Sequence, residues 1–223
     1  MLTEAKYQAV LFDLDGTLLN TIDDLADAMN AALATCGLPT HTADECKYFV
    51  GDGVRNFAVR SLPPDRRDEA TLGKIIPLYR DAYSKNWDHK TRPYEGVPEL
   101  LDALTARRLK LIVYSNKPDE FTNLTVRKLL AKWAFAAIVG AREGFPNKPD
   151  PSASLDILGK LGLRPAQVVY VGDTGTDMQT ATAAGMFAVG ALWGFRTAKE
   201  LLENGAKVLI KEPMDLLDVL GIQ

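Results

Sequence analysis

The chain is organised around a short apolar run that stops at two carboxylates. Ala9–Phe12 has the apolar character of a buried strand, and Asp13 and Asp15 follow it directly. In an open parallel α/β sheet, ligands bind beyond the carboxyl ends of the strands, so we expect both carboxylates to face a crevice. Two carboxylates this close repel each other unless a proton or a cation intervenes. The alternative is a strand that simply ends in a turn, where Asp and Gly are common.

The composition is that of an ordinary globular protein. The 223 residues are 47% hydrophobic and 25% charged, enough for one large domain, or one domain with an insert, without structural metal or disulfides. The net charge of −3 argues against nucleic acid or an anionic membrane as the main partner. No window reaches the ~18 apolar residues that a membrane span requires.

Two further features predict a cytoplasmic location. Residues 1–8 are few and polar and contain no long apolar segment, so we expect no signal peptide. Cys36 and Cys46 have no metal-ligand spacing and no C-x-x-C pairing, which favours reduced thiols. Oligomeric state cannot be inferred from the sequence.

Residues 20–92 form a helical block in this interpretation. Apolar spacing predicts helices at about 22–36, 43–50, 54–62 and 69–87, with no convincing strand between them. Thr21 and Asp24 resemble a capping box at the start of the first helix. Because the block directly follows the acidic turn, we expect it to lie over the crevice and to act as a lid.

From residue 93 onward, helices and strands alternate. Strands are expected at 109–114, 136–140, 168–171, 187–190 and 208–210, separated by helical segments. This order predicts an α/β fold with a doubly wound parallel sheet. The first strand belongs with this region, so we expect residues 1–19 and 93–223 to form one core and residues 20–92 to be an insert.

Three later segments place polar side chains at or near strand ends. Ser115 and Asn116 offer donors that suit phosphate oxygens, although a local cap is an alternative. Lys148 lies in a proline-flanked loop, where a solvated lysine is the default expectation. Asp173 and Asp177 follow a strand and enter a helix, which they could simply cap.

Taken together, these segments resemble the four motifs of the haloacid dehalogenase superfamily. D-x-D-G-T, Ser-Asn, Lys-Pro and G-D-x-x-x-D occur in the family's order. The resemblance implies a Rossmann-like core, and the insert after the first motif matches the members with an all-helical cap domain. Most members are phosphatases, and the acid at Asp15 distinguishes this sequence from the dehalogenases.

The resemblance also implies a role for each matching position. Asp13 would be the nucleophile that forms an aspartyl-phosphate, and Asp15 the general acid and base. Mg²⁺ would be held by Asp13, Asp173 and the Asp15 backbone carbonyl, with Asp177 completing or supporting the shell. The groups expected to hold the phosphoryl oxygens are Ser115, Asn116 and Lys148.

The predicted substrate is a small phosphorylated metabolite. Val50-Gly51-Asp52-Gly53 is similar to the cap signature of phosphoglycolate phosphatases, which implies 2-phosphoglycolate. Gly51 and Gly53 would let the backbone approach a small acid. Arg55 could pair with a substrate carboxylate or could simply be solvated. A sugar-phosphate mutase and a receiver-like phospho-Asp regulatory protein are the alternatives.

Overall fold

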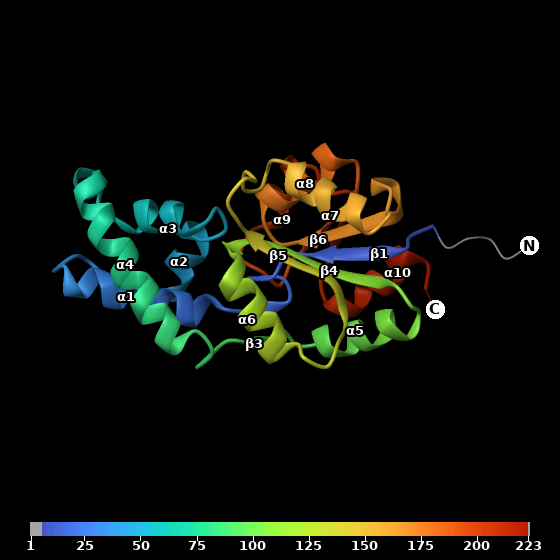
Figure 1. Ribbon diagram of the computed structural model, residues 1–223, viewed down its shortest axis with the longest axis horizontal. Coiled ribbons are helices and arrows are strands. Elements are labelled where there is room, and N and C mark those ends of the chain that lie inside the picture. Colours follow the sequence, from blue (N-terminus) through green and yellow to red (C-terminus); the bar gives the residue numbers. More distant parts are fainter. Residues whose placement is uncertain (1–5, 223) are drawn as a thin grey trace, which may run out of the picture.

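The computed structural model describes residues 6–222 and contains a six-stranded, all-parallel sheet (Figure 1). The strand order is β5-β4-β1-β6-β7-β8. The strands are β1 (Ala9–Phe12), β4 (Lys110–Pro118), β5 (Phe135–Ala141), β6 (Val168–Gly172), β7 (Phe187–Ala191) and β8 (Val208–Ile210). Successive connections leave the central strand β1 in opposite directions, so the predicted doubly wound α/β fold is confirmed.

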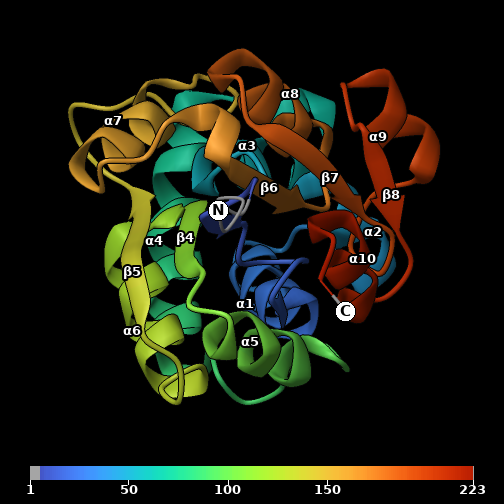
Figure 2. The same cartoon turned by 90° about the vertical axis from the view of Figure 1, so that its right-hand side faces the viewer.

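Helices cover both faces of this sheet (Figures 1 and 2). One face packs against α5 (Val97–Ala106), α6 (Asp119–Leu129) and α10 (Leu216–Leu220), and the other against α7 (Ser152–Lys160), α8 (Gly175–Ala184) and α9 (Ala198–Glu203). Strand β1 shows why both faces are apolar. Val10 and Phe12 join one apolar cluster, while Ala9 and Leu11 join the other.

The helical block comprises α1 (Ile22–Thr35), α2 (Ala43–Phe49), α3 (Val54–Ser61) and α4 (Glu69–Asn86). These helices share an apolar cluster of their own, at one end of the sheet (Figure 1). The chain enters and leaves the block through two short strands, β2 (Leu19–Asn20) and β3 (Arg92–Pro93), which pair antiparallel. The remaining elements are the short 3-10 helices Pro64–Arg66, Pro165–Gln167 and Pro213–Asp215.

The predicted capping box at the start of α1 is wrong. Thr21 has helical backbone angles and its hydroxyl makes no capping hydrogen bond. Asp24 instead accepts hydrogen bonds from the backbone N–H of Lys90 and from the hydroxyl of Thr91, at 3.0 and 2.7 Å. The carboxylate therefore fastens the start of the block to its exit segment, a contact between positions more than 60 residues apart that a local motif cannot reveal.

Strand β4 is longer than predicted. Apolar character ends at Tyr114, but the strand extends to Pro118, which pairs with Ala141 of β5 after a register shift. The polar residues between them are buried, because both neighbouring strands and the helical block surround this end of the sheet. The change from apolar to polar residues after Tyr114 therefore marks where the pocket-lining residues begin, and the strand itself continues.

Within residues 6–222, we find no helix that combines the length and the apolar character needed to cross a membrane. The expectation about a signal peptide rests partly on residues 1–5, which lie outside the described residues.

Candidate active site

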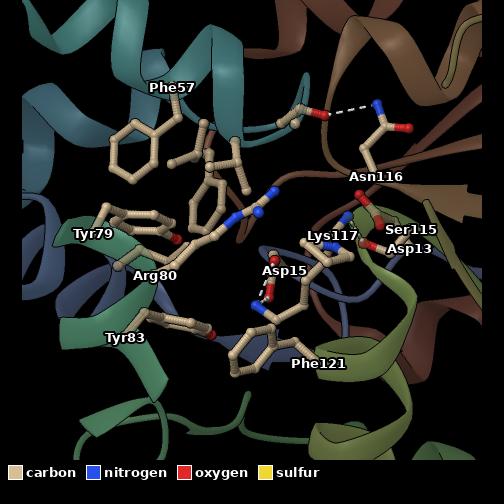
Figure 3. Close-up of a pocket in the computed structure, with 17 residues that line it drawn as sticks. Asp13, Asp15, Phe57, Tyr79, Arg80, Tyr83, Ser115, Asn116, Lys117 and Phe121 are labelled. Atoms are coloured by element: carbon tan, nitrogen blue, oxygen red, sulfur yellow. Dashed lines mark hydrogen bonds and ion pairs between the residues drawn. The ribbon is translucent and has the colours of Figure 1, made fainter. Parts of the chain in front are cut away.

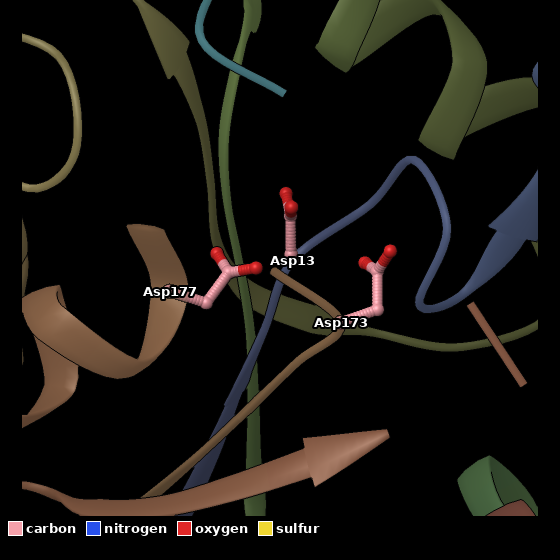
Figure 4. Close-up of side chains that lie close together, drawn as sticks. All are labelled: Asp13, Asp173 and Asp177. Carbon is pink, nitrogen blue, oxygen red and sulfur yellow. The ribbon is translucent and has the colours of Figure 1, made fainter. Parts of the chain in front are cut away.

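Three acidic side chains from two strand ends meet at the carboxyl edge of the sheet (Figure 4). Asp13 follows β1, Asp173 follows β6, and Asp177 lies in the first turn of α8. Each offers a carboxylate oxygen, and these oxygens lie within 4.8 Å of one another. All three residues are buried. The structure therefore brings Asp13 together with two carboxylates that are 160 or more positions away from it in the sequence.

Asp13 is held by one backbone donor and one cation. Its Oδ1 accepts a hydrogen bond from the backbone N–H of Leu14 at 2.7 Å and lies 3.0 Å from Lys148 Nζ. Burial, and next the charge of Asp177, raise the pKa of Asp13 to about 7, while Lys148 opposes this rise. Lys148 thus favours the ionised form of Asp13 without fully offsetting the effect of burial.

Asp173 is oriented from both sides of the crevice. The Thr17 hydroxyl donates to its Oδ1 at 2.7 Å, and the backbone N–H of Phe195 donates to its Oδ2 at 2.9 Å. Burial, with Asp177 and Asp13 adding to it, raises the pKa of Asp173 to about 8. Burial therefore makes the ionised form of Asp173 costly unless a cation lies nearby.

Both oxygens of Asp177 accept hydrogen bonds from protein donors. Oδ1 accepts from Lys148 Nζ at 2.7 Å and from the Tyr170 hydroxyl at 3.0 Å. Oδ2 accepts from the backbone N–H and the hydroxyl of Thr174, which forms a capping box at the start of α8. This arrangement suits a carboxylate that supports its neighbours. The sequence analysis did not identify Tyr170, since a tyrosine inside an apolar strand looks like core.

Lys148 is a buried residue and not the solvated loop lysine of the default expectation. Burial disfavours its charged form, but the charges of Asp13 and Asp177 outweigh this effect and raise the pKa of Lys148. Asn116 holds the loop: its Oδ1 accepts from the Lys148 backbone N–H at 2.9 Å, and its Nδ2 donates to the Lys148 carbonyl at 3.3 Å. The sequence predicts that Asn116 binds phosphate; in the structure it positions the loop that carries Lys148.

The donor set fits a hard divalent cation. When ionised, three carboxylates and one ammonium leave two net negative charges in a buried space, which is costly without compensation. A divalent cation would balance that charge. Carboxylate and carbonyl oxygens are the ligands that Mg²⁺ prefers, and Asp13 Oδ2 accepts no hydrogen bond from the described residues.

Asp15 lies beside a lysine that the sequence analysis did not identify. Lys117 Nζ is 3.1 and 3.0 Å from Asp15 Oδ1 and Oδ2, and the ammonium lies 4.8 Å from the centre of the Tyr83 ring. The Lys117 side chain is only 3% exposed. A lysine two residues after Ser115, at a buried strand end, is the signal that could have indicated it.

The helical block supplies one wall of the pocket above these groups (Figure 3). Gly51 and Gly53 both line it with positive φ angles, and Asn116 Nδ2 donates to the Gly51 carbonyl at 3.0 Å. Thr176 donates to Asp52 at 2.9 Å, which ties the same loop to α8. Ser115 lines the opposite wall, near Asp13 and Asp15.

Arg55 does not line this pocket. Its exposed side chain pairs with Glu69 on the outside of the helical block. Arg80 of α4 lines the pocket instead, and its guanidinium points across it toward the side that carries Asp15 (Figure 3). Both arginines lie on helix faces, so only the packing of α3 against α4 distinguishes them.

The backbone at Gly16 lies so close to the Asp173 side chain that any larger residue at position 16 would crowd it. Its φ is +88°, and a Cβ there would lie 2.7 Å from Asp173 Cγ. We expect Gly16→Ala to lower the free energy of unfolding by about 3 kcal/mol, from left-handed strain plus crowding. Gly37→Ala is the matched control, because Gly37 has φ +67° but open space around it. We expect about 1 kcal/mol there; equal losses in urea titrations would contradict the crowding.

The sequence and the fold were compared with known proteins. A family model described as haloacid dehalogenase-like hydrolase matches residues 10–191. The phosphoglycolate phosphatase of Aquifex aeolicus is 34% identical over 188 residues, covering 84% of this chain and 86% of the relative. That of Nitrosospira multiformis is 33% identical over 206 residues and covers 91% of each chain.

Solved structures agree with these relatives. The crystal structure of a predicted phosphoglycolate phosphatase from Haemophilus somnus has a TM-score of 0.88 at 26% identity, covering 97% of this chain and 99% of that one. A hydrolase from Pseudomonas syringae has a TM-score of 0.76 at 26% identity, covering 96% and 98%. The chain therefore belongs to the haloacid dehalogenase-like hydrolase family. Within it, the protein is a phosphoric monoester hydrolase.

Proposed function

We propose that this protein is a Mg²⁺-dependent phosphatase that hydrolyses a small phosphate monoester through an aspartyl-phosphate on Asp13, with 2-phosphoglycolate as its substrate. The observation that carries the proposal is the meeting of Asp13, Asp173 and Lys148 beside one pocket, from three separate parts of the chain. We further propose that residues 20–92 act as the cap and that the enzyme works in the cytoplasm.

The cation would be held by Asp13, Asp173 and the backbone carbonyl of Asp15. Bound there, Mg²⁺ would neutralise phosphoryl charge and orient the phosphate toward the nucleophile. Asp177 supports this set, since its contacts with Lys148 and Tyr170 fix the lysine beside Asp13. This role fits a carboxylate whose two oxygens already accept hydrogen bonds.

Covalent catalysis divides the reaction into two displacements. Asp13 Oδ2 attacks phosphorus, and the bond from phosphorus to the ester oxygen breaks. Asp15 donates its proton to that departing oxygen, then takes a proton from the water that attacks the aspartyl-phosphate, which releases inorganic phosphate and restores Asp13. Lys117 Nζ lies 3.0 Å from Asp15 Oδ2 and holds this carboxyl group in position.

The phosphoryl oxygens would be bound by donors already at the pocket. Ser115 lines it, and Lys148 presents a buried ammonium beside the nucleophile. Charged donors in a water-poor site stabilise developing negative charge more strongly than they would in bulk water. Asn116 contributes by holding the Lys148 loop and the Gly51 carbonyl.

The choice of 2-phosphoglycolate rests on two lines of support. Relatives that match over most of the chain carry the name phosphoglycolate phosphatase. The Gly51 and Gly53 backbone also lies directly at the pocket, where no side chain intervenes. We expect the partner to be a small phosphorylated metabolite, with no nucleic acid and no membrane involved.

Phosphate release from a panel of small phosphate esters tests the proposal. With Mg²⁺ we expect turnover of 2-phosphoglycolate above the other esters, no activity with excess chelator, and recovery when Mg²⁺ is added back. Preferred hydrolysis of a different ester would overturn the substrate assignment alone. Isomerised sugar phosphate without free phosphate would indicate a mutase, and stable phosphorylation of Asp13 without turnover would indicate a receiver.

A further inference from the structure

The wall opposite the nucleophile is mostly apolar but contains one cation. Phe57, Tyr79 and Tyr83 of the helical block line the pocket together with Arg80 (Figure 3). Glycolate, the leaving group of the proposed substrate, carries a carboxylate that an apolar wall would not bind. Arg80 is therefore the residue of this wall whose chemistry matches that group.

The charge of Arg80 is available to a ligand. Within residues 6–222, Arg80 has neither an ion pair nor a hydrogen bond to any other side chain, although the neighbouring arginines do. Arg55 pairs with Glu69, and Arg60 pairs with Asp52. The other two cations at the site are also engaged, Lys117 with Asp15 and Lys148 with Asp13 and Asp177.

We propose that Arg80 is a specificity-determining residue that binds the carboxylate of the substrate's leaving group while Asp13 attacks its phosphoryl group. A guanidinium remains charged at all working pH values and offers paired N–H donors that match the two oxygens of a carboxylate. Although Arg80 is an exposed residue, its guanidinium points across the pocket, where a bound ester would meet it (Figure 3). This proposal rests on the proposed function and names the recognition element within it.

The position of Arg80 also links recognition to the helical block. It lies on α4, next to Tyr79 and one turn before Tyr83, whose ring contacts the Lys117 ammonium. A carboxylate on Arg80 would therefore connect α4 to the substrate, and through it to the sheet edge. An ester without this carboxylate would lose the contact with Arg80 but would keep all of its contacts at the phosphoryl group.

Two esters that differ only in this group test the proposal. We expect Arg80→Met to lower kcat/KM for 2-phosphoglycolate by about 10- to 100-fold, the effect of losing a charged hydrogen-bonding partner. For ethyl phosphate, which lacks the carboxylate, we expect a change within about twofold, since no interaction is lost. Arg80→Lys should recover part of the loss. Arg55→Met is the matched control and should change neither value, because Arg55 lies outside the pocket.

Binding measurements separate this inference from the proposed function. Titration calorimetry of both esters with Asp13→Asn protein, with and without Arg80→Met, compares affinities in the absence of turnover. A selective loss of 2-phosphoglycolate binding supports the role of Arg80 even if the wild-type protein releases no phosphate. Equal effects on the two esters, or none on either, overturn it, whatever the activity of the wild-type enzyme.

Discussion

Asp13→Asn should abolish phosphate release, lowering kcat by roughly 10⁴-fold or more, the scale of losing a covalent nucleophile. The amide keeps the size of the carboxylate but cannot attack phosphorus. It also removes one negative charge beside Lys148, so the fold should be retained. Burial raises the pKa of Asp13, so keeping this carboxylate ionised lowers the stability of the folded protein. A group with such a raised pKa in a pocket is a candidate for a functional role.

Steady-state phosphate release with Mg²⁺ measures the loss, and two variants make it specific. Asp27→Asn is the matched control: Asp27 is exposed on α1 and pairs with Lys90, so kcat should be unchanged. Asp15→Asn should slow the second displacement and leave a phosphoryl group on the protein, visible by intact mass. An Asp13→Asn protein that retained substantial activity would contradict covalent catalysis at this position.

The meeting of Asp13, Ser115 and Asp173 at one edge of the sheet could be predicted, because their positions follow a topological rule. The carboxyl ends of parallel strands lie at one edge of a sheet, so the polar residues at the ends of β1, β4 and β6 are expected to meet once the strands are correctly assigned. Asp13 and Asp173 are 160 positions apart, yet a pattern of strands and helices suffices to place them at one edge. Lys148 needed the family resemblance, since its loop follows no buried strand directly.

The residues that the sequence analysis did not identify depend on tertiary packing. Lys117 contacts Asp15 and Tyr170 contacts Asp177 because of the position that each occupies on its strand. Tyr170 looks like core among its apolar neighbours, whereas Lys117 follows Ser115 and Asn116 without a contact that the sequence reveals. Arg55 and Arg80 illustrate the same limit on helices. Each lies on an amphipathic helix, and only the rotation of that helix against the core decides which guanidinium reaches the pocket.

Lys148→Met should strongly destabilise the metal-free protein. The substitution keeps an unbranched side chain of similar length but leaves Asp13 and Asp177 buried without their cation. Removing one partner from a buried charge pair typically costs about 3–5 kcal/mol. Urea unfolding at pH 8 with chelator present measures this loss. Lys160→Met on α7, where Lys160 is exposed and pairs with Asp156, should change stability by no more than about 0.5 kcal/mol.

The same variant should be less destabilised at pH 5 than at pH 8. Burial raises the pKa of Asp13 from 3.8 to about 7, so the folded state binds this proton more tightly than the unfolded chain does. The stability that this group contributes is fully present below about pH 4 and is lost as the pH rises through about 7. Lys148 limits the loss, because its ammonium favours the carboxylate. Without Lys148 the loss of stability at pH 8 becomes larger, whereas at pH 5 protonation of Asp13 removes much of the need for a cation.

Added Mg²⁺ should restore part of the stability of the Lys148→Met protein at pH 8, because it supplies positive charge beside the same carboxylates. A destabilisation equal at both pH values would show that Lys148 acts through packing and not through charge.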